Sequence, residues 1–410
     1  MKKVFRILSL IAIVFASVLA SVLLYLALPG TPSRSRFVAF DGYIDLPKGG
    51  SLDVLDYLTL RDRTLFVTDE SSGAVFKVSL DPNTQMARGE VSQLPGSGSA
   101  HGVALLSEQS IAFVTRSGKN AVDVFDPANL QALGNIPVAE DADAILYDPS
   151  NKLVYVANGD AKLATLIDPE KRTLIETIPL PGKPEYPALD LKTGLLYQNL
   201  TDVNSVAAIN LAQRSVVGQW PLAPCDGPTG MVIDVEQRRL FAVCSRNATL
   251  VVFDLERHQT IASVGIGGGP DSVAFDPVYH RIYSAGRSGK LSVVQQDSPD
   301  AYHLLEEINT HYGAHTLALD PATHRVFVGY ASLFNHPRIA VFSPSMSPSS
   351  SNPFSGAVSS AIVSLRRGCM ETRLNPRKQG LRAERDLRNH LCASAWIVNE
   401  TFCGFMIEAL

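Results

Sequence analysis

Five titratable side chains and a threonine recur at matching positions of an internal repeat, and together they could bind a metal ion or a small ligand. The set is His101, Asp143, Glu185, Thr229, Asp271 and His315, and its members are 42 or 44 residues apart. In the first repeat, Asp53 or Asp56 could take the same place. Carboxylates that converge repel one another, which raises their pKa values or recruits a cation. Imidazoles with carboxylates suit a divalent metal ion whose coordination shell is completed by water.

Two simpler roles compete with ligand binding at these positions. Polar side chains at the mouth of a channel often hold only ordered water. Single acidic residues in loops that enter strands also cap turns. Whether a cofactor binds is therefore open, and a divalent metal ion is the one candidate that the residue types suggest.

The repeat itself predicts the elements that position these residues. Aspartates mark the turn after a first strand at 148, 190, 234, 276 and 320. A second series, aspartate at 81, 126, 168 and 254 and asparagine at 210, marks the turn after a third strand. Both series have a period just above forty residues, with four short apolar strands in each unit. That period with four strands is typical of a β-propeller, whose first strands line a central channel. We expect the recurrent aspartates, such as Asp148 and Asp168, to cap these turns.

Counting the second strand of each unit gives seven copies. They begin at residues 65, 111, 153, 195, 240, 282 and 326. The last copy lacks an evident fourth strand, whereas an unassigned strand, 37–46, precedes the first copy. Pairing that strand with the seventh unit would close the ring and remove an exposed sheet edge. The sequence therefore predicts an all-β, seven-bladed propeller over 37–344.

One copy carries a recognisable signature. Residues 155–158 read Tyr-Val-Ala-Asn and residues 166–169 read Leu-Ile-Asp-Pro, with looser copies at 65–69 and 113–116. This pattern resembles the YVTN-type repeat, related to WD40-like repeats, of YncE-like exported propeller proteins. The resemblance implies an exported seven-bladed propeller, usually without an assigned catalytic activity. It also implies that some relatives bind DNA or serve as surface proteins.

The two ends of the chain do not belong to the repeat. Lys2, Lys3 and Arg6 precede an uncharged apolar run, 7–28, that could be a cleaved secretory signal peptide or an uncleaved transmembrane anchor. Both hypotheses for segment 1–36 place the rest of the chain in the periplasm or at the cell surface, secreted or attached to the membrane. Segment 345–410 begins Ser/Pro-rich and contains no copy of the repeat, so we expect a linker and a tail without packed structure.

A basic rim is expected around the acidic centre, from loops between second and third strands. Its members are Arg116, Lys119, Lys162, Arg246, Arg287 and Lys290. Such a rim could hold an anionic ligand, although solvated loop charges are more common. Tyr186, Tyr312, Tyr330 and Phe334 could stack on a ligand or fill the channel. The net charge of −4 argues against nucleic acid as the main partner but leaves a local patch open.

The five cysteines are too few for a disulfide scaffold and include no CxxC pair. Cys225 and Cys244 fall in the same unit and should reach the same face. In an oxidising compartment they could form a disulfide. The alternative is two buried thiols.

Two functions follow, with no catalytic residue assigned. The first is an exported, monomeric binding propeller that uses the channel mouth for a protein, a small molecule or an anionic ligand. The second is a lactonase-like hydrolase, in which Asp143, Glu185, Asp271, His101 and His315 hold a metal ion or act as acid and base.

Overall fold

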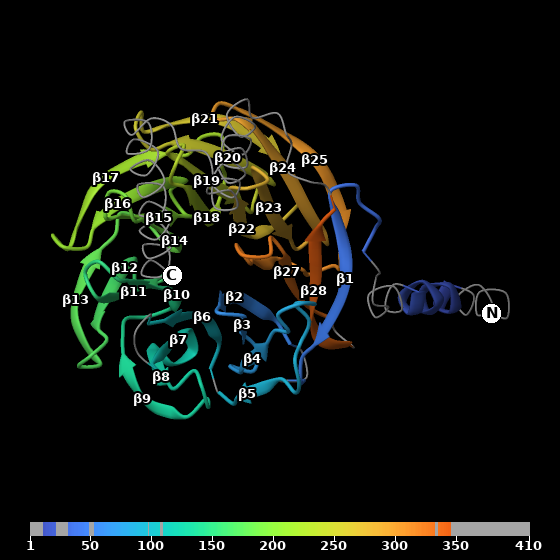
Figure 1. The fold of residues 1–410 in the computed structure, drawn as a ribbon, viewed down its shortest axis with the longest axis horizontal. Coiled ribbons are helices and arrows are strands. Elements are labelled where there is room, and N and C mark those ends of the chain that lie inside the picture. Colours follow the sequence, from blue (N-terminus) through green and yellow to red (C-terminus); the bar gives the residue numbers. More distant parts are fainter. Residues whose placement is uncertain are drawn as a thin grey trace, which may run out of the picture. The chain divides into compact units, whose positions relative to one another are not determined.

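The computed structural model describes residues 11–21, 32–48, 53–96, 98–106, 110–332 and 335–345, without the side chains of 332, 335 and 336. The described residues form seven four-stranded sheets, arranged around one axis (Figure 1). This confirms the predicted all-β, seven-bladed propeller. The unit Ser347–Leu410, which contains nearly all of the expected tail, lies outside the described residues.

Six of the sheets run from the axis outward in sequence order, and the seventh runs β26, β27, β28 and then β1; all neighbouring strands are antiparallel. The innermost strands are β2 (Leu55–Arg61), β6 (Ala100–Leu105), β10 (Ala142–Asp148), β14 (Pro184–Asp190), β18 (Pro228–Asp234), β22 (Pro270–Asp276) and β26 (Thr316–Leu319). The second strands are β3 (Thr64–Asp69), β7 (Ala112–Arg116), β11 (Leu153–Asn158), β15 (Leu195–Leu200), β19 (Arg239–Cys244), β23 (Arg281–Gly286) and β27 (Val326–Ser332).

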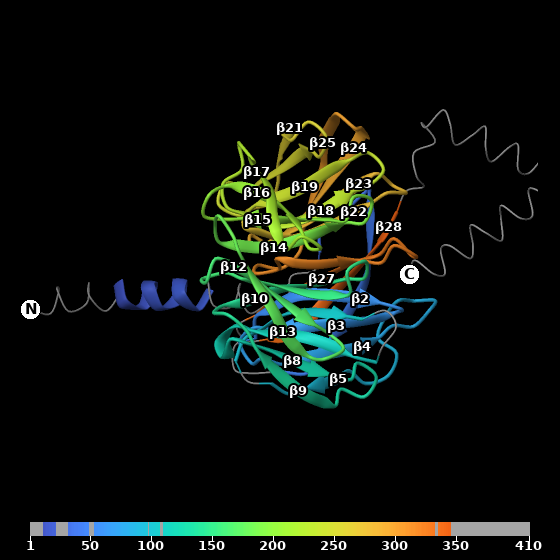
Figure 2. The same ribbon diagram turned by 90° about the vertical axis from the view of Figure 1, so that its left-hand side faces the viewer.

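The third strands are β4 (Val75–Ser79), β8 (Ala121–Phe125), β12 (Leu163–Asp168), β16 (Ser205–Asn210), β20 (Thr249–Asp254), β24 (Lys290–Ser298) and β28 (Asn335–Pro344). The outer strands are β5 (Ser92–Leu94), β9 (Ala132–Pro137), β13 (Thr173–Pro179), β17 (Ser215–Pro221), β21 (Gln259–Gly265), β25 (Ala301–Asn309) and β1 (Val38–Asp45). In the view from the side, β9 and β21 lie at opposite edges and β10 and β22 lie between them (Figure 2). A short 3-10 helix, η1 (Ser117–Lys119), links β7 and β8.

The ring closes through the strand that precedes the first repeat. β1 pairs antiparallel with β28 from Val38–Pro344 to Asp45–Arg338, and the two strands lie side by side in Figure 1. Val38 and Ile44 are buried in this sheet. The seventh blade is thus built from both ends of the repeat region, which protects the edge of β28 from pairing with another chain.

Alternate residues of the middle strands pack against opposite neighbours, as the pleat of a strand requires. In β11, Val154 and Val156 join a cluster with Phe113 of the preceding blade, whereas Tyr155 joins a cluster with Leu196 of the following blade. From Leu153 to Ala157 the strand has no charged or small polar side chain, because both of its faces are buried. Each such side chain contributes about 1.5–3 kcal/mol by leaving water.

The predicted role of the recurrent turn aspartates is confirmed. Asp148 Oδ1 accepts a hydrogen bond from the amide of Ser150 at 2.9 Å. Asp168 Oδ1 accepts from the amides of Glu170 and Lys171 at 3.0 and 2.9 Å. A carboxylate at the start of a tight turn binds amides that the strands leave unpaired, so these acids are structural.

The expected membrane-spanning or signal helix is not supported. The helix at the N-terminus covers 11–21, and in the stretches the structure describes no helix is long and apolar enough to cross a membrane. The rest of the apolar run, 7–10 and 22–28, lies outside the described residues.

Candidate functional site at the channel mouth

Six innermost strands have a β-bulge at the same point. The register shifts lie between Leu55 and Leu58, Ala100 and Val103, Ala142 and Ile145, Pro184 and Pro187, Pro228 and Met231, and Pro270 and Ser272. A bulge leaves a residue outside the pairing ladder and redirects its side chain. The residues at these bulges include Asp56 and all of the predicted ring except His315, which directly precedes β26.

The predicted ring residues meet in one cavity of about 330 Å3. Asp56, His101, Asp143, Glu185, Thr229, Asp271 and His315 all line it. Of the two candidates in the first blade, Asp56 lies in the cavity, because the bulge of β2 turns it to the axis. The remaining lining residues, which sequence reasoning missed as part of the site, include Tyr57, Glu70, Asp141, Lys183 and Ser245.

Side chains of the preceding blade hold the backbone of several ring residues. The Thr68 hydroxyl donates to the carbonyl of His101, and the Thr115 hydroxyl donates to the carbonyl of Asp143 at 2.5 Å. Thr68 and Thr115 end the Val-Thr pairs of the repeat signature. The signature therefore marks contacts that position the ring residues, a signal that was present in the sequence. At Gly102 a Cβ would lie 2.8 Å from Ile145 Cγ2, so glycine allows the neighbouring inner strands to approach.

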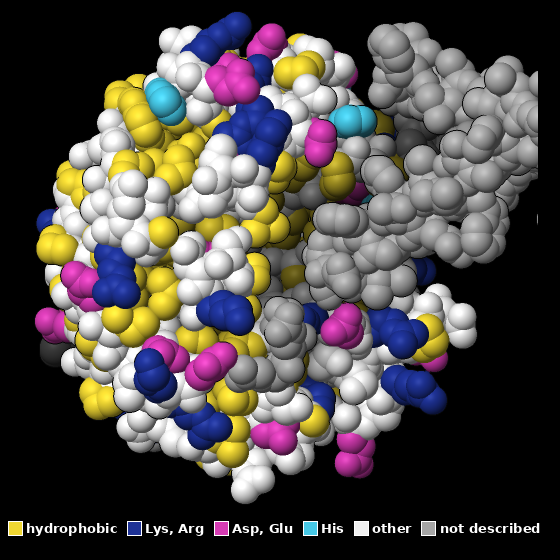
Figure 3. Space-filling view, turned by 60° about the vertical axis from the view of Figure 1, so that its left-hand side comes forward, with side chains coloured by type: hydrophobic (Ala, Val, Ile, Leu, Met, Phe, Trp, Pro, Cys, Tyr) yellow, Lys and Arg dark blue, Asp and Glu magenta, His cyan; other side chains and the backbone are white. Residues whose placement is uncertain are grey.

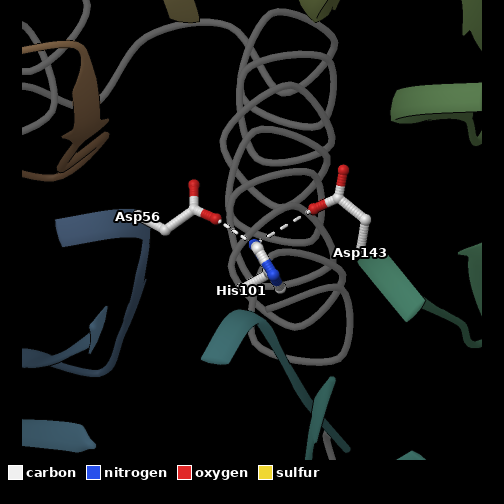
Figure 4. Close-up of side chains that lie close together, drawn as sticks. All are labelled: Asp56, His101 and Asp143. Atoms are coloured by element: carbon white, nitrogen blue, oxygen red, sulfur yellow. Dashed lines mark hydrogen bonds and ion pairs between the residues drawn. The ribbon is translucent and has the colours of Figure 1, made fainter. Parts of the chain in front are cut away.

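His101 bridges two carboxylates (Figure 4). Its Nδ1 lies 2.6 Å from Asp56 Oδ2 and 3.5 Å from Asp143 Oδ1, and its Nε2 lies 2.7 Å from Ser117 Oγ. Burial by itself lowers the pKa of His101, but the hydrogen bond and charge of Asp56, with the charge of Asp143, raise it to about 9. The imidazole is thus a cation at neutral pH that offsets part of the negative charge of the cavity.

Asp271 and His315 form a second, more open pair near Asp56. His315 Nε2 lies 3.7 Å from Asp271 Oδ2, beyond hydrogen-bond range, and Nδ1 lies 2.7 Å from the carbonyl of Gly313. Arg287, at the edge of the cavity, donates a hydrogen bond of 3.1 Å to Asp271 Oδ2. Burial raises the pKa of Asp271, against the lowering effects of His315 and Arg287.

The cavity holds more carboxyl groups than its cations neutralise. Burial, with the charges of Asp143 and Asp271, raises the pKa of Glu185 to about 9. Burial also raises the pKa of Asp143 to about 7, although His101 opposes this. Lys183 is engaged at the edge, 2.7 Å from Asp160 Oδ1 and 3.3 Å from Asp141 Oδ2. Carboxyl groups that favour their neutral form in the absence of a ligand are a site for positive charge.

Thr229 lines the cavity, yet its hydroxyl serves the fold. It donates to the carbonyls of Pro270 at 2.9 Å and Val243 at 3.3 Å. Its contact with Pro270 fixes the start of β22, where Asp271 follows. Thr229 therefore positions the site and offers little to a ligand.

Two tyrosines from distant blades lie against each other next to the acidic groups. The rings of Tyr57 in β2 and Tyr186 in β14 lie 4.9 Å apart, and Tyr57 also lines the cavity. Tyr330 is buried and stacks on His311 at 4.5 Å. Tyr312 is 66% exposed, and Phe334 lies outside the described residues.

Most side chains of the expected basic rim have polar partners, and one of them is buried. Arg116 is 1% exposed and binds Asp123 at 2.8 Å and the carbonyl of Gly73, so it is a core residue. Four others are bound to polar partners: Lys162 to Asp202, Arg246 to Asp226, Arg287 to Asp271 and Lys290 to Asn309. Lys119 is exposed in η1. Basic and acidic side chains are interspersed on the face shown in Figure 3.

Cys225 and Cys244 are joined by a disulfide. Both side chains are buried. The bond ties the loop that enters β18 to the end of β19, beside the bulge that presents Thr229.

Two groups of side chains could hold a metal ion among the described residues. Asp56, His101 and Asp143 form one, and Asp56, Asp271 and His315 form the other; within each group the ligand atoms lie within 4.8 Å of one another. The donors are two carboxylates and one imidazole in each case, a set that suits a divalent transition metal.

Comparisons with known proteins support the fold and go no further. No protein-family model matches the chain, so the YVTN-type resemblance is not confirmed. No curated protein matches it. The structure is similar to a chain of hydrazine synthase from Kuenenia stuttgartiensis, with a TM-score of 0.61 and 17% identity over 71% of this chain and 96% of that chain. At this identity the likeness shows a shared propeller architecture and says nothing of activity.

Proposed function

We propose that this chain is a non-catalytic binding propeller that holds a positively charged ligand in the channel-mouth cavity. The convergence of four carboxyl groups, Asp56, Asp143, Glu185 and Asp271, on one cavity carries the proposal. Three of them have raised pKa values, so the ligand-free cavity takes up protons that a cation would replace. The anionic ligand considered from the sequence is disfavoured, because three of the rim cations, Lys162, Arg246 and Arg287, already pair with neighbouring acids.

The proposal includes export. The disulfide between Cys225 and Cys244 supports an oxidising compartment, where such bonds persist. The basic and apolar order of the first 28 residues supports the same location. A monomer is the simplest state, since the closed ring leaves β28 paired.

Thermal unfolding with added cations tests the binding proposal. Divalent metal ions and a small diamine should raise the melting temperature, because a ligand that binds only the native state stabilises it. Asp271→Asn should weaken that stabilisation, whereas Asp202→Asn, which removes an acid paired with Lys162 on a rim loop, should leave it unchanged. Stabilisation by none of these cations would refute the proposal.

A lactonase-like hydrolase is the second candidate. The observation in its favour is Asp143, whose pKa of about 7 suits a general acid or base near neutral pH. Turnover of a lactone that is lost in Asp143→Asn would support it. If no lactone is turned over and cation binding is intact, the hydrolase is ruled out and the binding function stands.

A further inference from the structure

We propose that the ligand of this cavity is a divalent transition-metal ion bound by Asp56, Asp271 and His315, and that His101 is not one of its ligands. This inference rests on the proposed function, since it names the cation that the cavity binds. The three ligand atoms lie within 4.8 Å of one another. Ligands about 2.1 Å from one ion lie at most about 4.2 Å apart, so small side-chain movements would complete the site.

His315 provides the first observation, independent of the acidic cluster. Its side chain is 6% exposed, and its Nδ1 donates to the carbonyl of Gly313 at 2.7 Å. That hydrogen bond fixes the ring so that Nε2 faces the cavity. Within the described ranges no group lies within hydrogen-bond range of Nε2, and Asp271 Oδ2 is 3.7 Å away. A metal-ligating histidine shows this pattern, with one nitrogen held by a backbone carbonyl and the other directed at the ion.

His101 provides the contrast within the same cavity. Both of its ring nitrogens have partners, Asp56 on Nδ1 at 2.6 Å and Ser117 on Nε2 at 2.7 Å. A metal ion bound by His101 would have to break one of these two hydrogen bonds. The ring nitrogens of the group with Asp143 are thus already engaged, whereas Nε2 of His315 in the group with Asp271 is not hydrogen-bonded to any described residue.

Asp56 belongs to both groups. Its Oδ2 accepts the hydrogen bond from His101, and a carboxylate can accept that bond and still offer an oxygen to an ion. Hydrogen bonds to a ligating carboxylate orient it and tune the metal. His101 is therefore a positioning residue for the metal site.

The donor set predicts which ions bind. An imidazole favours transition metals, whereas sites for Mg2+ and Ca2+ are built from oxygen ligands alone. Three protein ligands leave coordination positions for water or a substrate group. We expect Zn2+ to bind more tightly than Mn2+, and Mn2+ more tightly than Mg2+.

The test is Zn2+ titration by calorimetry of the metal-depleted, untagged full chain, with metal content measured after dialysis. Wild-type protein should bind one Zn2+. His315→Ala should lower the affinity more than about 100-fold, and His101→Gln should lower it about tenfold, as expected for a residue that only orients a ligand. A variant with Ser at Cys369, Cys392 and Cys403 should retain wild-type affinity, which excludes zinc binding by these thiols.

Each outcome decides the inference. Unchanged affinity in His315→Ala, or a larger loss in His101→Gln than in His315→Ala, overturns it. If His315→Ala does not fold, as judged by circular dichroism, Asp271→Asn provides the test with a side chain of the same shape. If the wild type binds no Zn2+ but the diamine still stabilises it and Asp271→Asn abolishes the effect, the metal inference fails and the proposed function stands. If neither ligand binds, both fail.

Discussion

His101 Nδ1 lies 2.6 Å from Asp56 Oδ2, and this ion pair joins the innermost strands of the first two blades. Both side chains are nearly buried, with 12% and 11% exposed. A charge pair at such a position is costly to break, because the remaining partner keeps an uncompensated charge away from water. The pair therefore belongs to the stability of the fold as well as to the site.

Replacement of His101 by glutamine should lower the free energy of unfolding by about 3 kcal/mol. Urea denaturation of the metal-free protein measures this. His303→Gln is the matched control, since it removes a pair with Asp297 of the same 2.6 Å length but about half exposed. The control should cost less than about 1 kcal/mol. Equal losses of unfolding free energy in the two variants would show that burial does not increase the contribution of the His101 pair to stability.

Glu185 should make the metal-free protein less stable as the pH rises. Its pKa is raised to about 9 in the folded state from the ordinary value of 4.5, so between these values the folded state binds a proton that the unfolded state has released. The stabilising contribution is complete below the unfolded pKa and is lost as the pH approaches 9, with a slope of up to about 1.4 kcal/mol per pH unit.

Urea denaturation from pH 5 to 9 checks this linkage. Glu185→Gln should flatten the decline in the free energy of unfolding, because glutamine has no proton to lose. Glu176→Gln, at an exposed pair with Arg214, should leave the wild-type slope. A slope in Glu185→Gln that matches the wild type would contradict the raised pKa.

The fold could be predicted from the sequence because the residues that cap the turns recur in each repeat. Asp148 and Asp168 recur with their strands at a constant period, and their amide hydrogen bonds explain that recurrence. The closing strand could also be found, since a propeller with one blade short of a strand needs a partner for β28.

The site could be predicted only in outline. The period of the repeat predicts that His101 and Asp271 occupy equivalent positions in their blades. The choice of Asp56 over Asp53 depends on a β-bulge that cannot be predicted from the local sequence. Arg116 was misplaced because its position at the end of a second strand suggested a loop, whereas its guanidinium turns inward to Asp123 and Gly73. Charge partners from other blades cannot be deduced from local sequence.

Arg116→Ala should therefore behave as a core substitution. We expect a loss of about 3 kcal/mol in the free energy of unfolding, because Asp123 and the Gly73 carbonyl lose a buried partner. Lys119→Ala, three residues later on the surface, should change it by less than about 0.5 kcal/mol. If both substitutions change the free energy of unfolding by similarly small amounts, Arg116 is a surface residue of the rim and not a core residue.

Removal of the disulfide should also destabilise the propeller. Cys225 and Cys244 are 19 residues apart, and a cross-link of about that span contributes about 3 kcal/mol. The Cys225→Ala, Cys244→Ala double variant should show this loss in urea denaturation. Peptide mapping without reductant should recover the two cysteines as one linked fragment, and two separate peptides with reactive thiols would contradict the bond.

The most direct test of cation binding at the channel mouth is an anomalous difference map from a crystal of the protein soaked in Zn2+, recorded at the zinc absorption edge. The account predicts one peak in the cavity, about 2.0–2.2 Å from His315 Nε2 and from carboxylate oxygens of Asp56 and Asp271. A cavity with no peak, or with a peak bound through His101, would contradict it.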